Sequence, residues 1–147
     1  MAATSPSRLF VDSSAFIALI CRDDSAHSRA LSYYKSLNAA TRLCTTILVV
    51  SETYAWLRYH VGFSVAARFL RSVEEMEPGR SIELLYVSPE LKAKTHQTLL
   101  KYPDQMLSYV DALSFVVVEE EDIGDVFSLD RHFHILKRRV WPSGARE

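Results

Sequence analysis

The chain has 147 residues, of which 48% are hydrophobic and 24% charged, with a formal net charge of -1. This length and balance are those of an ordinary globular protein, so we expect one domain over residues 1–147 and exclude a disordered or fibrous chain. A charge this close to zero excludes a polybasic protein that coats nucleic acid through bulk charge. The longest apolar runs, such as 47–50 and 115–118, are too short to cross a bilayer, which favours a cytoplasmic location.

Short runs of strand character alternate with longer amphipathic helical patterns along the chain. The strand cores LFV, LCTT and DVF do not alternate cleanly between apolar and polar residues, which is typical of strands buried on both faces. Strands joined by helices in this way form right-handed βαβ units. We therefore predict an α/β protein with a central, mostly parallel sheet of about five strands, at 8–11, 43–46, 82–87, 125–128 and 140–141. The predicted helices cover 15–21, 25–38, 47–61, 64–73, 89–102 and 108–119.

Single residues mark the ends of these helices. Ser25, Ser64, Ser88 and Ser108 are predicted N-caps, because a serine hydroxyl can accept a hydrogen bond from the free N–H groups of the first turn. Gly62 is predicted to end the helix that precedes it, since glycine adopts the left-handed conformation that follows many helices.

Four acidic residues fall where predicted strands end or where the next helices begin: Asp12, Glu52, Asp111 and Asp130. The carboxyl ends of parallel strands share one edge of the sheet, and ligands bind there, so these side chains can face one crevice. Without a cation, carboxylates gathered in this way would repel one another and raise their own pKa values. Oxygen ligands select Mg²⁺ or Mn²⁺, which can activate a water against a phosphate. We therefore predict a hydrolytic metal site on these four residues.

Each acid taken alone also has an ordinary structural explanation. Asp12 could cap a helix, Glu52 and Asp111 could complement helix dipoles, and Asp130 could form a turn before Arg131. Their placement together in one βα framework favours the functional interpretation.

Four short motifs surround these acids. They are Phe10-Val-Asp12-Ser-Ser14-Ala-Phe, Ser51-Glu52-Thr-Tyr, Leu107-Ser-Tyr-Val-Asp111-Ala-Leu-Ser and Val126-Phe-Ser128-Leu-Asp130-Arg-His-Phe133. In this order and at this spacing, over nearly the whole chain, they resemble the motifs of the PIN-domain ribonucleases. The resemblance is closest to the short VapC-like toxins of bacterial toxin-antitoxin pairs.

The resemblance implies a PIN-like three-layer α/β/α fold and an endoribonuclease that depends on Mg²⁺ (or Mn²⁺). It also implies RNA as substrate, a homodimer, a cognate antitoxin, and the four acids as catalytic and metal-binding residues. Asp104 stands at the place of an additional upstream acid. Ser14 and Ser128 are predicted to orient metal ligands through their hydroxyls, and Ser128 stands where threonine is commoner.

Other residues suggest roles that the sequence leaves open. Arg131 could guide an RNA backbone, and Tyr54 and Trp56 could stack on bases. Tyr54 and Trp56 lie among apolar residues of a predicted helix, so packing in the core or in a dimer interface is favoured for them. Cys21 and Cys44 lack the spacing of a zinc site and are predicted to be buried, reduced thiols. The same lack of ligand spacing argues against zinc at His60, His96, His132 and His134.

Rival functions meet specific objections. A phosphatase of the haloacid dehalogenase type requires a second aspartate two positions after Asp12, where this chain has Ser14. Walker A, GxGxxG and GxSxG motifs are absent from the sequence, which argues against nucleotide-binding enzymes and serine hydrolases. The alternatives that stay open are a non-catalytic PIN-like module that binds RNA or protein, and a housekeeping RNA-processing nuclease.

Overall fold

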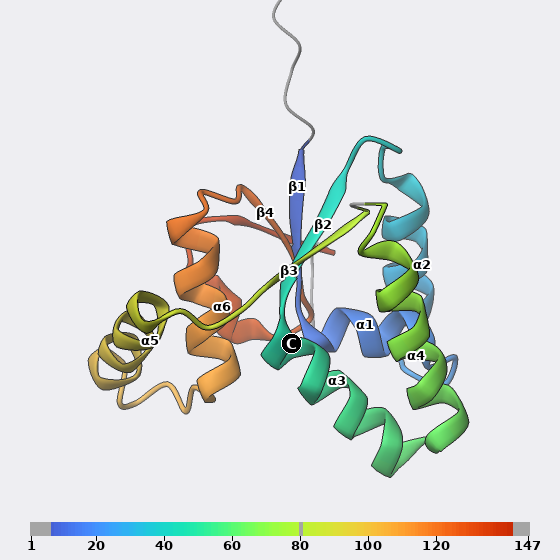
Figure 1. Ribbon diagram of the computed structural model, residues 1–147, viewed down its shortest axis with the longest axis horizontal. Coiled ribbons are helices and arrows are strands. Elements are labelled where there is room, and N and C mark those ends of the chain that lie inside the picture. Colours follow the sequence, from blue (N-terminus) through green and yellow to red (C-terminus); the bar gives the residue numbers. More distant parts are fainter. Residues whose placement is uncertain (1–6, 80, 143–147) are drawn as a thin grey trace, which may run out of the picture.

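The computed structural model describes residues 7–79 and 81–142 and has three layers, helices, sheet and helices (Figure 1). The five strands are all parallel and stand in the order β3-β2-β1-β4-β5. They are β1 (Arg8–Val11), β2 (Arg42–Thr46), β3 (Ile82–Leu85), β4 (Asp125–Phe127) and β5 (Arg139–Trp141). The helices are α1 (Ser13–Ile20), α2 (His27–Ser36), α3 (Ile47–His60), α4 (Phe63–Met76), α5 (Pro89–Lys101), α6 (Tyr109–Glu120) and the 3₁₀ helix η1 (Arg131–Ile135). The predicted fold class is thus confirmed.

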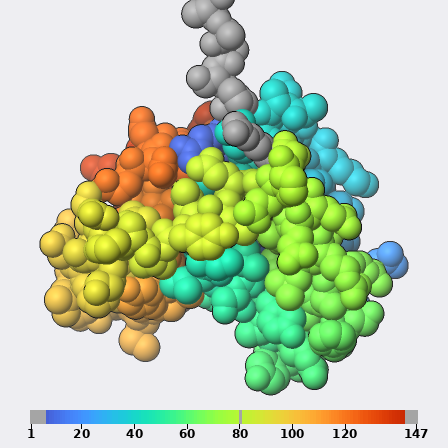
Figure 2. All heavy atoms as spheres, viewed as in Figure 1, coloured from blue at the N-terminus to red at the C-terminus, as the bar shows by residue number. Residues whose placement is uncertain are grey.

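The sheet lies between two groups of helices, α1 to α4 on one side and α5 and α6 on the other (Figure 1). In the space-filling view the α3–α4 pair, in teal and green, and the α5–α6 pair, in yellow and orange, project as two lobes with a hollow between them (Figure 2). Within the described residues, no helix has the length and hydropathy needed to span a membrane.

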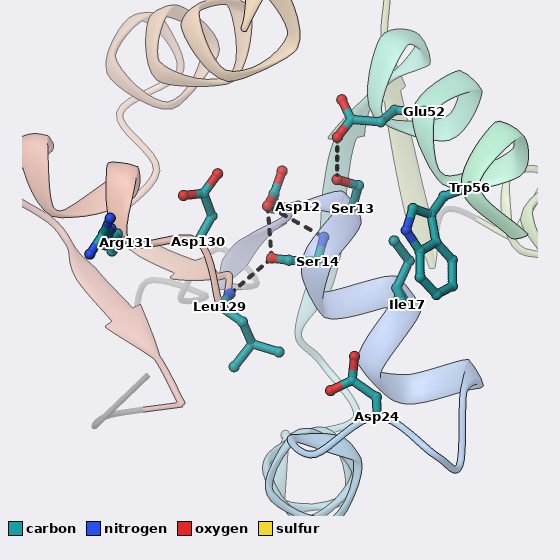
Figure 3. Close-up of a pocket in the computed structure, with 10 residues that line it drawn as sticks. All are labelled: Asp12, Ser13, Ser14, Ile17, Asp24, Glu52, Trp56, Leu129, Asp130 and Arg131. Atoms are coloured by element: carbon teal, nitrogen blue, oxygen red, sulfur yellow. Dashed lines mark hydrogen bonds between the residues drawn. The ribbon is translucent and has the colours of Figure 1, made fainter. Parts of the chain in front are cut away.

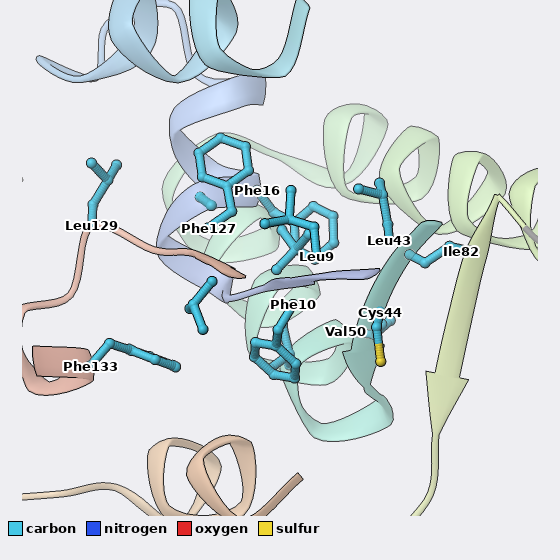
Figure 4. Close-up of a cluster of buried hydrophobic side chains, with 14 of the residues drawn as sticks. Leu9, Phe10, Phe16, Leu43, Cys44, Val50, Ile82, Phe127, Leu129 and Phe133 are labelled. Atoms are coloured by element: carbon cyan, nitrogen blue, oxygen red, sulfur yellow. The ribbon is translucent and has the colours of Figure 1, made fainter. Parts of the chain in front are cut away.

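The central strand β1 is buried on both faces, as its continuously apolar sequence predicts. Successive side chains of a strand point to opposite faces. Phe10 faces Phe133, with ring centroids 6.3 Å apart, while Leu9 lies on the side of Phe16 and Phe127 (Figure 4). The exposed fractions of Leu9 and Phe10 are 1% and 0%. This burial fixes the end of β1, and with it the residue that follows, Asp12.

Two of the four predicted serine caps are confirmed, and two are wrong. Ser88 and Ser108 accept hydrogen bonds from the first turns of α5 and α6. α2 begins only at His27, because the Asp24 carboxylate accepts the N–H of Ala26 at 2.8 Å and holds residues 24–26 in a turn. The prediction for Ser25 therefore fails.

The connection between α3 and α4 explains the failure at Ser64. Gly62 has φ +139°, a conformation that side chains rarely allow, and its N–H donates to the carbonyl of Leu57 at 2.8 Å. Gly62 thereby ends α3, as predicted. It also leads directly into α4, which begins at Phe63 without a side-chain cap.

Two further predictions need correction, and one element was not predicted. β3 ends at Leu85, two residues before its predicted end, and no element was predicted over the residues of η1. Cys44 is buried as predicted, whereas Cys21 is only half-buried, and both are free thiols.

Replacing the confirmed cap Ser88 by alanine is expected to destabilise the protein by about 1 kcal/mol, because the N–H of Leu91 would lose its 3.1 Å acceptor. Thermal unfolding followed by circular dichroism should show a melting temperature lower by about 2–4 °C. Ser32→Ala, an exposed serine inside α2, is the matched control. Equal melting temperatures for Ser88→Ala and wild type would contradict the capping role.

Candidate functional site

Asp12 occupies the carboxyl end of β1 and is the N-cap of α1. Its backbone N–H continues the β1–β4 ladder by donating to the carbonyl of Phe127 at 3.0 Å. Its side chain is 2% exposed and accepts the hydroxyl protons of Ser14 at 2.8 Å and Ser128 at 3.0 Å. The same two hydroxyls accept the backbone N–H groups of Leu129 and Asp130. The Asp12 carboxylate is therefore held in one orientation by both neighbouring loops.

The other three predicted acids are also oriented by local contacts. Glu52, in the second turn of α3, accepts the hydroxyl proton of Ser13 at 2.8 Å. Asp111 forms a capping box with Ser108, in which each side chain accepts the backbone N–H of the other. The N-cap of η1 is Asp130, whose Oδ1 accepts the N–H of His132 at 2.9 Å. The structural roles foreseen for Asp12, Asp111 and Asp130 thus exist.

These contacts share a pattern that the structural roles alone do not require. Among the described residues, hydrogen bonds to Asp12 end on Oδ2, to Glu52 on Oε1, to Asp111 on Oδ2 and to Asp130 on Oδ1. Each carboxylate is thus fixed through one oxygen, while the second oxygen receives no hydrogen bond from this part of the protein. Four such oxygens are the kind of ligand that a hard divalent cation takes.

Three of the four acids line one cavity of about 560 Å³. Figure 3 shows the carboxylates of Asp12, Glu52 and Asp130 turned toward a common space at the ends of the strands. Asp111 lies beside this cavity, since its carboxylate is within 4.8 Å of the donor atoms of Asp130 and His132. The lining of the cavity consists of Asp12, Ser13, Ser14, Ile17, Asp24, Glu52, Trp56, Leu129, Asp130 and Arg131.

The acids influence one another's charge. Burial, helped by the charges of Asp111 and Asp130 and opposed by the hydrogen bonds from Ser14 and Ser128, raises the pKa of Asp12 to about 7. Partial burial and the charges of Asp111 and Asp130 raise the pKa of Glu52. Burial and the charge of Asp130 raise the pKa of Asp111. A divalent cation among these groups would offset the repulsion that keeps their protons bound.

The supporting residues predicted from the sequence divide into two groups. Ser14 and Ser128 contact the Asp12 carboxylate directly, as expected of residues that orient it. Asp104 lies exposed in the loop between α5 and α6 and is not part of the cavity lining.

Several residues near the acids were not among the site residues predicted from the sequence. Ser13, the neighbour of Asp12, donates its hydroxyl proton to Glu52, and its position just before the helix predicted at 15–21 was the available signal. His132 places its Nδ1 atom 3.0 Å from Asp130 Oδ1 and 3.6 Å from Asp111 Oδ2. Its place two residues after a predicted ligand was the only hint. Asp24 lines the cavity from a loop that carries no sequence pattern.

Trp56 and Arg131 lie on opposite walls of the cavity (Figure 3). The Trp56 ring is half-buried and stacks on His60, with centroids 4.4 Å apart and planes 12° from parallel. Packing against other side chains, which the sequence favoured, therefore accounts for only part of the environment of Trp56. The ring also lines the cavity in front of Glu52.

Known proteins were compared with this chain by family and by fold. A model described as the PIN domain matches residues 9–138. Among solved structures, VapC20 of Mycobacterium tuberculosis, a sarcin-ricin loop cleaving toxin, is 24% identical with a TM-score of 0.77, over 86% of this chain and 93% of that chain. FitAcB of Neisseria gonorrhoeae is 12% identical with a TM-score of 0.65, over 90% and 95%. VapBC2 of Rickettsia felis, bound to a DNA fragment from its promoter, is 9% identical with a TM-score of 0.65, over 90% and 96%.

At these identities the solved structures establish a shared fold. No curated protein matches the chain.

Proposed function

This chain belongs to the PIN domain family, and from that membership we propose that it is a divalent-metal-dependent endoribonuclease that hydrolyses phosphodiester bonds of RNA. The observation that carries the proposal is the set of four carboxylates, each fixed through one oxygen with the other left for a cation. A module that merely bound RNA would gain nothing from clustered negative charge facing phosphates.

The residues present fit a hard divalent cation. Asp12, Glu52, Asp111 and Asp130 would hold Mg²⁺ or Mn²⁺, both of which prefer carboxylate oxygens. The buried Nδ1 of His132, which has no hydrogen-bond partner among the described residues, also lies beside Asp111 and Asp130. When bound, such a cation lowers the pKa of a coordinated water and stabilises negative charge that develops on a phosphate.

The protein's own residues prepare this chemistry. Ser14 and Ser128 hold Asp12 rigid, so no reorganisation is needed when charge develops in front of it. Ser13 does the same for Glu52. Arg131, on the wall of the cavity, would contact the phosphate of an incoming strand, and Trp56 would bound the space for the adjoining base.

The biological role we propose is that of the toxin of a toxin-antitoxin pair. VapC20, whose fold this chain shares, is a sarcin-ricin loop cleaving toxin, and VapBC2 has the same fold. A cognate antitoxin that blocks the cavity, a homodimer and a cytoplasmic location belong to this proposal. A housekeeping RNA-processing role would use the same site, and only the presence of an antitoxin distinguishes the two.

Removing the metal is expected to abolish cleavage. Purified protein should cut a mixed cellular RNA preparation with Mg²⁺ or Mn²⁺, stop in excess EDTA, and resume when the metal is restored, as gel electrophoresis of the RNA would show. Cleavage that persists in EDTA would refute the metal mechanism. Inert protein that also fails to bind either ion in a calorimetric titration would favour the non-catalytic module.

A further inference from the structure

We propose that His132 supplies a nitrogen ligand to the cation held by Asp111 and Asp130, and that this ligand makes the centre prefer Mn²⁺ to Mg²⁺. The inference rests on the proposed metal site. It goes beyond the four carboxylates by naming a fifth residue and a preference between the two ions.

The position of His132 follows from the start of η1. Asp130 caps this short helix, and the resulting turn brings the ring of the residue two positions later back over the Asp130 side chain. The Nδ1 atom lies 3.0 Å from Asp130 Oδ1 and 3.6 Å from Asp111 Oδ2. Donor atoms of all three residues lie within 4.8 Å of one another.

These separations suit ligands around one ion. Adjacent ligands of a six-coordinate cation with bonds of about 2.1–2.2 Å lie about 3 Å apart. The distance from His132 Nδ1 to Asp130 Oδ1 has this value, and the distance to Asp111 Oδ2 exceeds it by little. These two oxygens are also the ones that accept backbone N–H groups, so a cation here would share them with those hydrogen bonds or take the second oxygens of the same carboxylates.

The Nδ1 atom itself lacks a partner. It is buried from solvent and, among the described residues, makes no hydrogen bond of acceptable direction, although two carboxylates are near. A cation between the ring and the carboxylates would give the orphaned atom a partner and would contact all three side chains.

A nitrogen ligand changes which cation binds best. Mg²⁺ prefers oxygen ligands and keeps its waters, whereas first-row transition ions also accept imidazole. With the imidazole of His132 beside the carboxylates of Asp111 and Asp130, Mn²⁺ gains from the nitrogen what Mg²⁺ does not. The sequence argues against a zinc site because the spacing of its histidines lacks a zinc pattern. That spacing does not test whether a single histidine joins carboxylates in binding a metal.

The direct test is the magnetic signature of the nitrogen. Electron spin echo envelope modulation of wild-type protein loaded with Mn²⁺ should show coupling to ¹⁴N, and His132→Ala should lose it while still binding Mn²⁺. His134→Ala is the matched control, because His134 is an exposed histidine on the same short helix. Mn²⁺-loaded wild type without nitrogen coupling would overturn the inference.

Equilibrium binding tests the preference separately. His132→Ala and His132→Asn should weaken Mn²⁺ binding by about tenfold or more and Mg²⁺ binding by about twofold or less, so that the Mn²⁺ preference falls. An unchanged ratio of the two affinities would overturn the inference and leave the proposed function standing. Wild-type protein that binds neither Mn²⁺ nor Mg²⁺ would overturn both this inference and the proposed metal-dependent function.

Discussion

Asp12→Asn is expected to lower kcat/KM for RNA cleavage by about a hundred- to a thousand-fold at saturating Mg²⁺ or Mn²⁺. Asparagine keeps the size of the side chain and can still accept the hydroxyl protons of Ser14 and Ser128. It removes the negative charge from the most buried of the four acids. The loss of kcat/KM would therefore be caused by removal of the charge and not by a change in the shape of the side chain. The rate should be measured on an RNA that wild type cuts in the metal-dependent assay.

The matched control is Asp122→Asn. Asp122 lies beyond the far end of α6 from Asp111, and its carboxylate is 93% exposed and paired with Arg138 at 3.4 Å. This substitution makes the same chemical change away from the cavity, so its cleavage rate should stay within about twofold of wild type, as exposed ion pairs contribute little. Full activity in Asp12→Asn would remove this carboxylate from the mechanism.

The strands and the acids at their ends could be predicted because they depend on local sequence. β1 and β4 are short apolar runs bounded by polar residues, so Asp12 and Asp130 follow their ends almost by necessity. Glu52 could be placed in the first turns of a helix for the same reason. That these acids lie together then follows from the parallel arrangement, since parallel strands end at one edge.

Helix starts and loop residues could not be predicted equally well, because tertiary contacts decide them. Ser25 and Ser64 are suitable caps by type, but Asp24 and Gly62 determine where the adjacent helices begin. The path of the chain from β4 to β5 depends on pairing between strands that follow each other only after η1. The position of His132 over the acids is a product of that path, and no periodicity in the sequence reports it.

The same substitution at Asp12 is expected to stabilise the metal-free protein, increasingly as pH rises. The folded-state pKa of Asp12 is raised to about 7, chiefly by burial, whereas an unfolded aspartate titrates near 3.9. Between these values the unfolded chain releases the proton while the folded protein retains it, so wild type loses stability as pH rises from about 4 to 7. Below pH 4 both states are protonated, and above the folded pKa the loss is constant. Asparagine has no proton to lose and escapes this penalty.

Thermal unfolding in EDTA at pH 4, 6 and 8 would measure the effect. Asp12→Asn and wild type should melt at similar temperatures at pH 4, and the variant should be more stable at pH 8 by on the order of 2–4 kcal/mol, or roughly 5 °C or more. Asp122→Asn, with its exposed carboxylate, should follow wild type at each pH. A difference between Asp12→Asn and wild type that does not grow with pH would contradict the raised pKa.

Adding Mn²⁺ at pH 8 should reverse the order of the two proteins. A ligand that binds only the folded state stabilises it by about 4.1 kcal/mol when present at about 1,000 times its dissociation constant, which matches or exceeds the difference expected at pH 8. Wild type, which keeps all four carboxylates, would gain this stabilisation, and Asp12→Asn would gain less of it. Loss of cleavage in a variant that is more stable than wild type without metal could not be attributed to unfolding. The buried charge of Asp12 would then be a feature that weakens the empty fold and is retained because the cation requires it.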